Sequence, residues 1–174
     1  MMKTVPGLHC FLIMTLLISG IFLGCSGDEP IGNIDPLPSR MSPYLSTERN
    51  AAWQAFENNN WTEPGKTAVI RSVKSPESGA TFYADIDHER NIIKLKSVRD
   101  KYTSIIFYDP YQQASTGFET NSSYVQSKCS CGGNRFQLAV GLLYETGKSG
   151  DDFSKFILAG TCTLCNETRF LFVR

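Results

Sequence analysis

The chain has 174 residues, of which 17 are basic and 17 acidic, so its formal net charge at pH 7 is zero. A chain without excess positive charge is not strongly attracted to nucleic acid or to anionic headgroups, and we expect no nucleic-acid partner. With only His9 and His88, the composition excludes a histidine-rich metal centre. The length suits one domain with its own core.

The N-terminal segment has the composition of an export signal. Lys3 precedes the apolar run CFLIMTLLISGIFL, which falls short of the roughly 20 apolar residues that a membrane-spanning helix needs. The end of this segment, Ile21-Phe22-Leu23-Gly24-Cys25, resembles the lipobox of bacterial lipoprotein precursors. The resemblance implies that a signal peptide, residues 1–24, is removed and that Cys25 is lipidated through its thiol.

The same resemblance implies a place in the cell envelope. Acyl chains on Cys25 would hold the protein on a membrane, which is the outer membrane if the organism is Gram-negative. The alternative is a secreted protein, because glycosylation sequons begin at Asn60, Asn121 and Asn166 and would be acceptors in a eukaryotic secretory pathway.

Prolines separate the signal from the folded part of the chain. Residues 25–44 carry four prolines among small and polar residues and are predicted to form an extended tether. Residues 45–174 are then predicted to form a single α+β domain. Its first element is a short helix within LSTERNAAWQAFENNN, with Ser46 or Thr47 as the cap and Ala52 and Phe56 on the buried face.

Short β-like runs follow the helix and are separated by turn residues. Connections this short join antiparallel neighbours, so we predict an antiparallel β-meander packed against the helix. Its strands are expected within TAVIRSV, ATFYADI, IIKLKSV and TSIIFYD.

The C-terminal segment, residues 128–174, is predicted to be a three-stranded β subdomain with four cysteines. RFQLAVGLLYE and KFILAGTC are strand-like, the turn TGKSGDD joins them, and TRFLFVR supplies a third strand. If the first two strands pair as a hairpin, the pair Cys129 and Cys131 meets the pair Cys162 and Cys165 at one end of it.

The two cysteine pairs resemble the knuckles of a zinc ribbon. Each pair is followed by a residue that tolerates a positive φ angle, Gly132 after Cys131 and Asn166 after Cys165. In that family the two knuckles hold one tetrahedral zinc ion through four thiolates. The resemblance implies one structural zinc bound by Cys129, Cys131, Cys162 and Cys165.

Two other kinds of chemistry suit the same cysteines. An exported chain meets oxidising conditions, so the four thiols can instead form two disulfides, and bridges between the pairs are preferred because one within Cys129-Ser130-Cys131 would be strained. The third possibility is a site for thiol redox chemistry.

These features predict a non-catalytic binding or interaction module with a structural four-cysteine site and an unknown protein or small-ligand partner. One alternative is a thiol-redox or metal-handling envelope protein, and another is an immunity-type protein against a toxin, which the cysteine-flanked sheet faintly resembles. The carboxylates around His88, from Asp85 to Glu89, are interpreted as a charged hairpin turn, and no catalytic residue is predicted.

Overall fold

The computed structural model describes residues 37–75, 81–99, 104–109 and 123–174, all within one unit that runs from Asp35 to Arg174. The predicted signal peptide 1–24, Cys25 and most of the predicted tether lie outside these residues. Among the described residues, no helix has the length and apolar character needed to cross a membrane.

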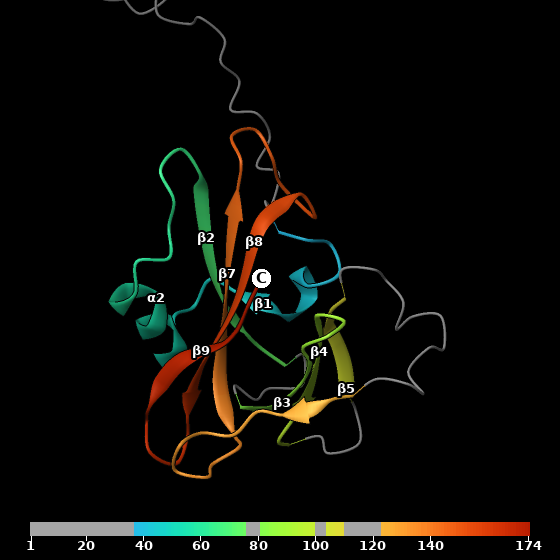
Figure 1. Ribbon diagram of the computed structural model, residues 1–174, viewed down its shortest axis with the longest axis vertical. Helices are drawn as coiled ribbons and strands as arrows, with labels where there is room; N and C mark the ends of the chain where they lie inside the picture. The colour runs from blue at the N-terminus through green and yellow to red at the C-terminus, as the bar shows by residue number, and fades with distance from the viewer. Residues whose placement is uncertain (1–36, 76–80, 100–103, 110–122) are drawn as a thin grey trace, which may run out of the picture. The chain divides into compact units, whose positions relative to one another are not determined.

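Strands dominate the described part of the chain (Figure 1). The helical elements are two short 3-10 helices, η1 (Ser42–Tyr44) and η2 (Ala51–Trp53), and one α-helix, α2 (Gln54–Asn58). The strands are β1 (Leu45–Ser46), β2 (Thr67–Val73), β3 (Phe82–Asp87), β4 (Ile92–Ser97), β5 (Ser104–Tyr108), β6 (Val125–Gln126), β7 (Phe136–Tyr144), β8 (Phe153–Cys162) and β9 (Thr168–Val173).

All nine described strands belong to one antiparallel sheet, and β7 lies at its centre. One edge of β7 pairs with β8 along its whole length, and β8 pairs in turn with β9. The other edge of β7 pairs with β2 over most of its length and with β3 only where Phe136 faces Phe82. Strands β3, β4 and β5 therefore form a second arm of the sheet, which pairs with β7 only at Phe136.

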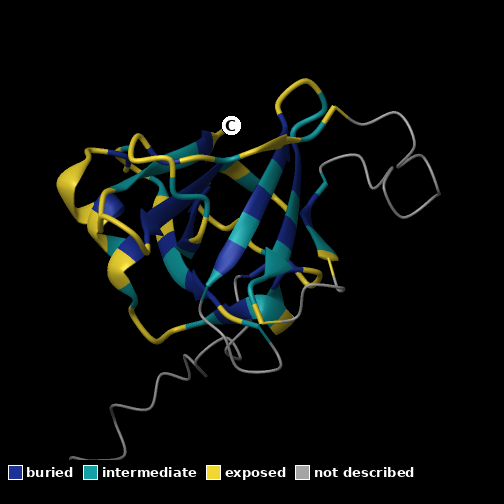
Figure 2. Cartoon of the chain, turned by 90° about the horizontal axis from the view of Figure 1, so that it is seen from below, coloured by how far each residue is buried: buried dark blue, intermediate teal, exposed yellow. Residues whose placement is uncertain are grey.

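The sheet curls, because the end of this second arm returns to β8. The ring of Tyr108 on β5 stacks on that of Phe156 on β8, with the centroids 4.2 Å apart. The Arg174 guanidinium also donates a hydrogen bond of 2.9 Å to the Tyr108 hydroxyl. The curl encloses the larger apolar core, and Figure 2 shows buried and intermediate positions alternating along its strands.

The predicted α+β class is wrong, because the fold is β-rich. Strands hold 46% of the described residues, whereas the helical segment, η2 followed by α2, has only eight residues. The helix does not begin at Ser46 or Thr47, since Leu45 and Ser46 pair with β2. Its cap is Asn50, whose side chain accepts a hydrogen bond from the Ala52 N–H and donates one to the Leu138 carbonyl.

The short helix still packs with the predicted face against the sheet. Ala52, Ala55 and Phe56 are buried, and the Phe56 ring meets Trp61 edge-on with centroids 5.0 Å apart. Gly141 on β7 makes room for this ring, because a Cβ there would lie 2.4 Å from a Phe56 ring carbon. The helix therefore covers only one part of the sheet, over β7 and β8.

The strand positions agree with the prediction, but the predicted meander holds only in part. Strands β3, β4 and β5 pair in sequence order, whereas β2 pairs with β1 and β7 instead of with β3. The middle of β7 and of β8 is buried, so the backbone N–H and C=O groups on both edges of these strands need hydrogen-bond partners from neighbouring strands.

The segment before β1 also contributes to the core. Leu37 and Met41, which lie in the predicted tether, are both buried there.

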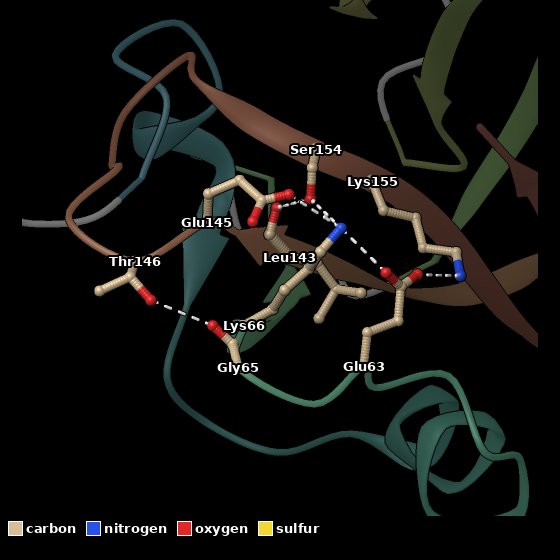
Figure 3. A network of polar contacts seen from close by, with 8 residues as sticks. All are labelled: Glu63, Gly65, Lys66, Leu143, Glu145, Thr146, Ser154 and Lys155. Atoms are coloured by element: carbon tan, nitrogen blue, oxygen red, sulfur yellow. Dashed lines mark hydrogen bonds and ion pairs between the residues drawn. The ribbon is translucent and has the colours of Figure 1, made fainter.

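A network of charged side chains ties the loop before β2 to the β7–β8 hairpin (Figure 3). Glu63 lies 2.9 Å from the Lys66 ammonium and 3.0 Å from that of Lys155 on β8. Lys66 also pairs with Glu145 at 3.0 Å and donates a hydrogen bond to Ser154. The two lysines lower the pKa of the Glu63 carboxyl through the hydrogen bonds that they donate, Lys66 more than Lys155.

Because the pKa of Glu63 is lowered in the folded chain, we expect part of the free energy of unfolding to depend on pH. A carboxyl with a lower pKa in the folded chain stabilises the fold above its unfolded pKa of about 4.3, and the contribution is lost as the pH falls through the folded value. We expect Glu63→Gln to reduce the loss of stability below about pH 4, measured by urea unfolding from pH 7 to pH 3. Glu48→Gln, at an exposed position outside the network, is the control. Identical pH profiles for Glu63→Gln and the unaltered chain would contradict the assignment.

Candidate metal centre

The β7–β8 hairpin brings the four predicted cysteines together. Cys129 and Cys131 lie in the turn before β7, Cys162 is the last residue of β8, and Cys165 lies in the turn between β8 and β9. Because Phe136 at the start of β7 pairs with Cys162, both turns lie at the same end of the hairpin. All four sulfur atoms are within 4.8 Å of one another.

Backbone hydrogen bonds close the first turn around its cysteines. The Cys129 N–H donates to the Gly133 carbonyl at 2.7 Å, and the Gly132 N–H donates to the Cys129 carbonyl at 2.9 Å. Gly132 has a φ angle of +83°, which the absence of a Cβ permits. The turn accommodates two cysteines separated by a single residue.

The second turn repeats this arrangement. The Cys162 N–H donates to the Glu167 carbonyl, and the Asn166 N–H donates to the Cys162 carbonyl, both at 2.9 Å. Asn166 has a φ angle of +60°, so both predicted positive-φ positions are confirmed. The Leu164 N–H also points at the Cys162 sulfur, at 3.4 Å. A backbone donor of this kind stabilises negative charge on the sulfur.

Gly133 is a residue whose importance the sequence did not reveal. A Cβ at this position would lie 2.8 Å from the Cys162 sulfur and 3.4 Å from the Cys131 sulfur. Any side chain here would therefore push into the cluster. In the sequence, Gly133 stands out only as the second glycine of a Gly-Gly pair. Its role could not be predicted, because it depends on contact with Cys162, which is far along the chain.

Burial divides the four cysteines into two kinds. Cys129 and Cys162 are buried, while Cys131 and Cys165 are exposed. Each buried sulfur lies next to an exposed one from the other turn, with Cys129 3.4 Å from Cys165 and Cys131 3.6 Å from Cys162. These distances exceed the S–S bond length of about 2.05 Å, and all four side chains are free cysteines in this structure.

The thiols differ in how readily they ionise. Burial raises the pKa of Cys162, but the backbone N–H groups of Leu164 and Cys165 and the neighbouring thiols outweigh it and lower that pKa to about 7. For Cys165 the Glu167 N–H lowers the pKa, yet the sulfurs of Cys131 and Cys129 raise it to about 12. A thiolate therefore forms more readily at Cys162 than at Cys165.

A carboxylate also contacts the cluster. The Cys129 thiol donates to Glu167 at 3.1 Å, and the Ser130 hydroxyl hydrogen-bonds to the same oxygen. The bonds from Ser130 and Cys129 lower the pKa of Glu167, and the charge of Arg169 adds to this effect. Nothing in the sequence pattern pointed to Glu167, since its contact depends on the meeting of the two turns.

The four cysteines lie close enough to bind a metal ion. Sulfurs at about 2.3 Å from a tetrahedral zinc are about 3.8 Å apart, and the two closest cross-turn distances, 3.4 and 3.6 Å, are slightly shorter. Four thiolates without a histidine or carboxylate form a soft donor set, which suits zinc.

The predicted hairpin turn between β3 and β4 holds His88 and Glu89, whereas Asp85 and Asp87 belong to β3. Asp87 is buried and accepts hydrogen bonds from the N–H groups of Glu89 and Arg90, at 3.1 and 3.0 Å. Asn91 closes the turn with a φ angle of +58°. His88 is exposed, with its ring 6.0 Å from that of Phe172.

Fold and site together define a β-rich protein whose central hairpin ends in a four-cysteine cluster. No protein-family model, no curated protein and no solved structure matches this chain. The function is therefore inferred from the chain's own residues.

Proposed function

We propose that this chain is an exported, lipid-anchored protein of the cell envelope that acts as a non-catalytic binding or interaction module, with one structural zinc in its four-cysteine cluster. The meeting of the four sulfurs at the end of the central hairpin carries the metal part of this proposal, and the lipobox-like residues that end at Cys25 support the anchor. A metal there would tie together the turns that flank β7, β8 and β9.

Several features of the cluster favour a structural zinc over a catalytic one. Structural zinc sites have four protein ligands, whereas catalytic sites keep a position open for water or substrate. The four sulfurs would fill all four positions of a tetrahedral site, and two of these cysteines are buried. Gly133 and the backbone turns bring the second pair of sulfurs close to the first without a side chain between them.

Intact mass of the protein purified from membranes tests the zinc. The mass is recorded under native and denaturing conditions, with and without thiol alkylation. We expect one zinc in the native spectrum that is lost on denaturation, and four cysteines that become alkylatable. A native mass without metal and lower by about four hydrogens would instead indicate two disulfides.

Exposure of Cys131 and Cys165 favours a second candidate, thiol-redox or metal-handling activity, because such chemistry needs an accessible thiolate. The cross-turn distances predict which bridges would form, namely Cys129 with Cys165 and Cys131 with Cys162. Peptide mapping after mild oxidation identifies these bridges. Reversible formation at the reduction potential of a cellular thiol pool would favour the redox role over the structural one.

The lipid anchor makes its own prediction. Cys25→Ala removes the thiol that would be acylated, so we expect nearly all of the protein to leave the membrane fraction, and labelled palmitate incorporation to disappear. The control is Cys10→Ala, which removes a thiol from the part of the signal that would be cleaved. Membrane retention of Cys25→Ala equal to that of Cys10→Ala would contradict lipidation.

A further inference from the structure

The four cysteines form two close pairs, and each pair joins a buried cysteine of one turn to an exposed cysteine of the other. The Cys129 sulfur lies 3.4 Å from that of Cys165, and the Cys131 sulfur lies 3.6 Å from that of Cys162. Cys131 and Cys165 are the exposed members. A small reagent from the solvent therefore reaches one cysteine of each pair, and the buried partner lies close to that cysteine.

This arrangement suits thiol–disulfide exchange. In such an exchange a thiolate attacks a disulfide sulfur and forms a mixed disulfide, which a second thiolate then resolves. The exposed cysteine of each pair is placed to form the mixed disulfide, and the buried cysteine is placed to resolve it. To form an S–S bond of about 2.05 Å, the two sulfurs of a pair have to approach by about 1.5 Å, which lies within the reach of side-chain rotation.

Gly133 keeps the space beside Cys131 and Cys162 free of a side chain. A Cβ at this position would lie 2.8 Å from the Cys162 sulfur and 3.4 Å from the Cys131 sulfur. Each cross-turn bridge would also join the turn before β7 to the end of β8 or to the turn after it, as a shared metal ion would. The end of the hairpin is therefore held together in either state.

We propose that the cluster is a site of oxidative modification, at which a small disulfide converts the two cross-turn thiol pairs into two bridges while the fold persists. The bridges join Cys131 to Cys162 and Cys129 to Cys165. This inference rests on the proposed zinc cluster and names how that cluster is regulated. It differs from the thiol-redox candidate, because the bridges stay within the chain and no electrons pass to a second protein. The proposed export would place the chain under the oxidising conditions in which disulfides form.

Each bridge forms by a two-electron exchange. Two cysteine thiolates lose two electrons and form one S–S bond, while the S–S bond of one small disulfide breaks and takes up these electrons as two thiolates. Solvent protonates the two new thiolates to thiols. After both exchanges no cysteine thiolate is left in the cluster, and since only the thiolate is a metal ligand, the proposed zinc would be released as Zn²⁺.

Oxidised glutathione tests this inference on the full chain in detergent, after reduction and addition of zinc. A coloured chelator measures zinc release, mass spectrometry maps the bridges, and circular dichroism monitors the fold. We expect one molecule of reduced glutathione per cysteine of the cluster, both cross-turn bridges, loss of the zinc and an unchanged spectrum. Samples alkylated early in the reaction should carry glutathione on Cys131 or Cys165 and not on their buried partners.

Matched variants separate the two pairs. Cys165→Ser should form only the bridge between Cys131 and Cys162, and Cys131→Ser should form only the bridge between Cys129 and Cys165. Leu164→Ala, at an exposed position in the second turn, keeps all four sulfurs and should form both bridges. A bridge within one turn, a glutathione adduct on a buried cysteine, or unfolding of the unaltered chain on oxidation would overturn the inference.

Two results separate this inference from the zinc proposal. A folded chain that holds one zinc and does not react with oxidised glutathione contradicts the oxidative site and leaves the structural zinc intact. A folded, reduced chain that takes up no zinc but forms both cross-turn bridges contradicts the metal proposal and leaves the oxidative site intact.

Discussion

If the cluster holds the proposed zinc, replacing Cys162 with serine should abolish zinc binding and lower the free energy of unfolding by about 4 kcal/mol or more, with a fall in Tm on the order of 10 °C. Cys162 is the most deeply buried of the four cysteines, with 0% of its surface exposed, and its sulfur receives a hydrogen bond from the Leu164 N–H. A serine oxygen is a poor zinc ligand, and the loss of one thiolate opens a closed tetrahedral site. The remaining cysteines would then lie in the cluster without their cation.

The neighbouring residue Leu164 supplies the control for Cys162→Ser. Leu164 lies in the same turn and is 71% exposed, so Leu164→Ala keeps the backbone and all four sulfurs. We expect this variant to retain one zinc per chain and to unfold within about 0.5 kcal/mol of the unaltered protein. Zinc is counted by native mass spectrometry, and stability is measured by urea unfolding with and without a chelator. A Cys162→Ser protein that kept its zinc would refute the assigned ligand set.

The cluster was predictable from sequence because its signals are local. The spacing within each cysteine pair, and the turn residues Gly132 and Asn166, depend on a few neighbouring residues. Only the register of one hairpin was needed to join the two turns, and a short polar turn between apolar strands indicates a hairpin directly. The contacts of Gly133 and Glu167 were not predictable, since each depends on the packing of one turn against the other.

The fold was predictable at the level of strands and not at the level of their neighbours. Alternation and β-branched residues indicate where β2 and β3 lie along the chain. They do not indicate that β2 pairs with β7 and not with β3, the next strand in sequence. The helix was overestimated because Ala52 and Phe56 have helical spacing, whereas Leu45 and Ser46, which precede them, are taken into β1. Tertiary pairing outweighs local propensity there.

A cavity of about 600 Å³ beside the start of β8 had no sequence signal. Arg40, Tyr108, Phe153 and Arg174 come from separate segments, and none of them belongs to a motif. They meet because the arm formed by β3, β4 and β5 folds back on β8. A site made by the curl of a sheet can be recognised only after the topology is known.

That arm leaves the central strand at Phe136, and Phe136→Ala should cost about 3–5 kcal/mol of stability. The ring is fully buried, its residue pairs with Phe82 on β3 and with Cys162 on β8, and it lies so close to Gly160 that a Cβ there would be 3.2 Å away.

Truncation of Phe136 would leave a cavity where the two arms meet, while all four sulfurs and both turns stay in place. We therefore expect Phe136→Ala to retain one zinc per chain, in contrast to Cys162→Ser, although its urea midpoint falls strongly. Phe136→Leu, which fills most of the space, should lose less than about 1.5 kcal/mol. If Phe136→Ala unfolded at the same urea concentration as Phe136→Leu, the arms would not depend on this ring, and the junction would have to be stabilised elsewhere along β3 and β7.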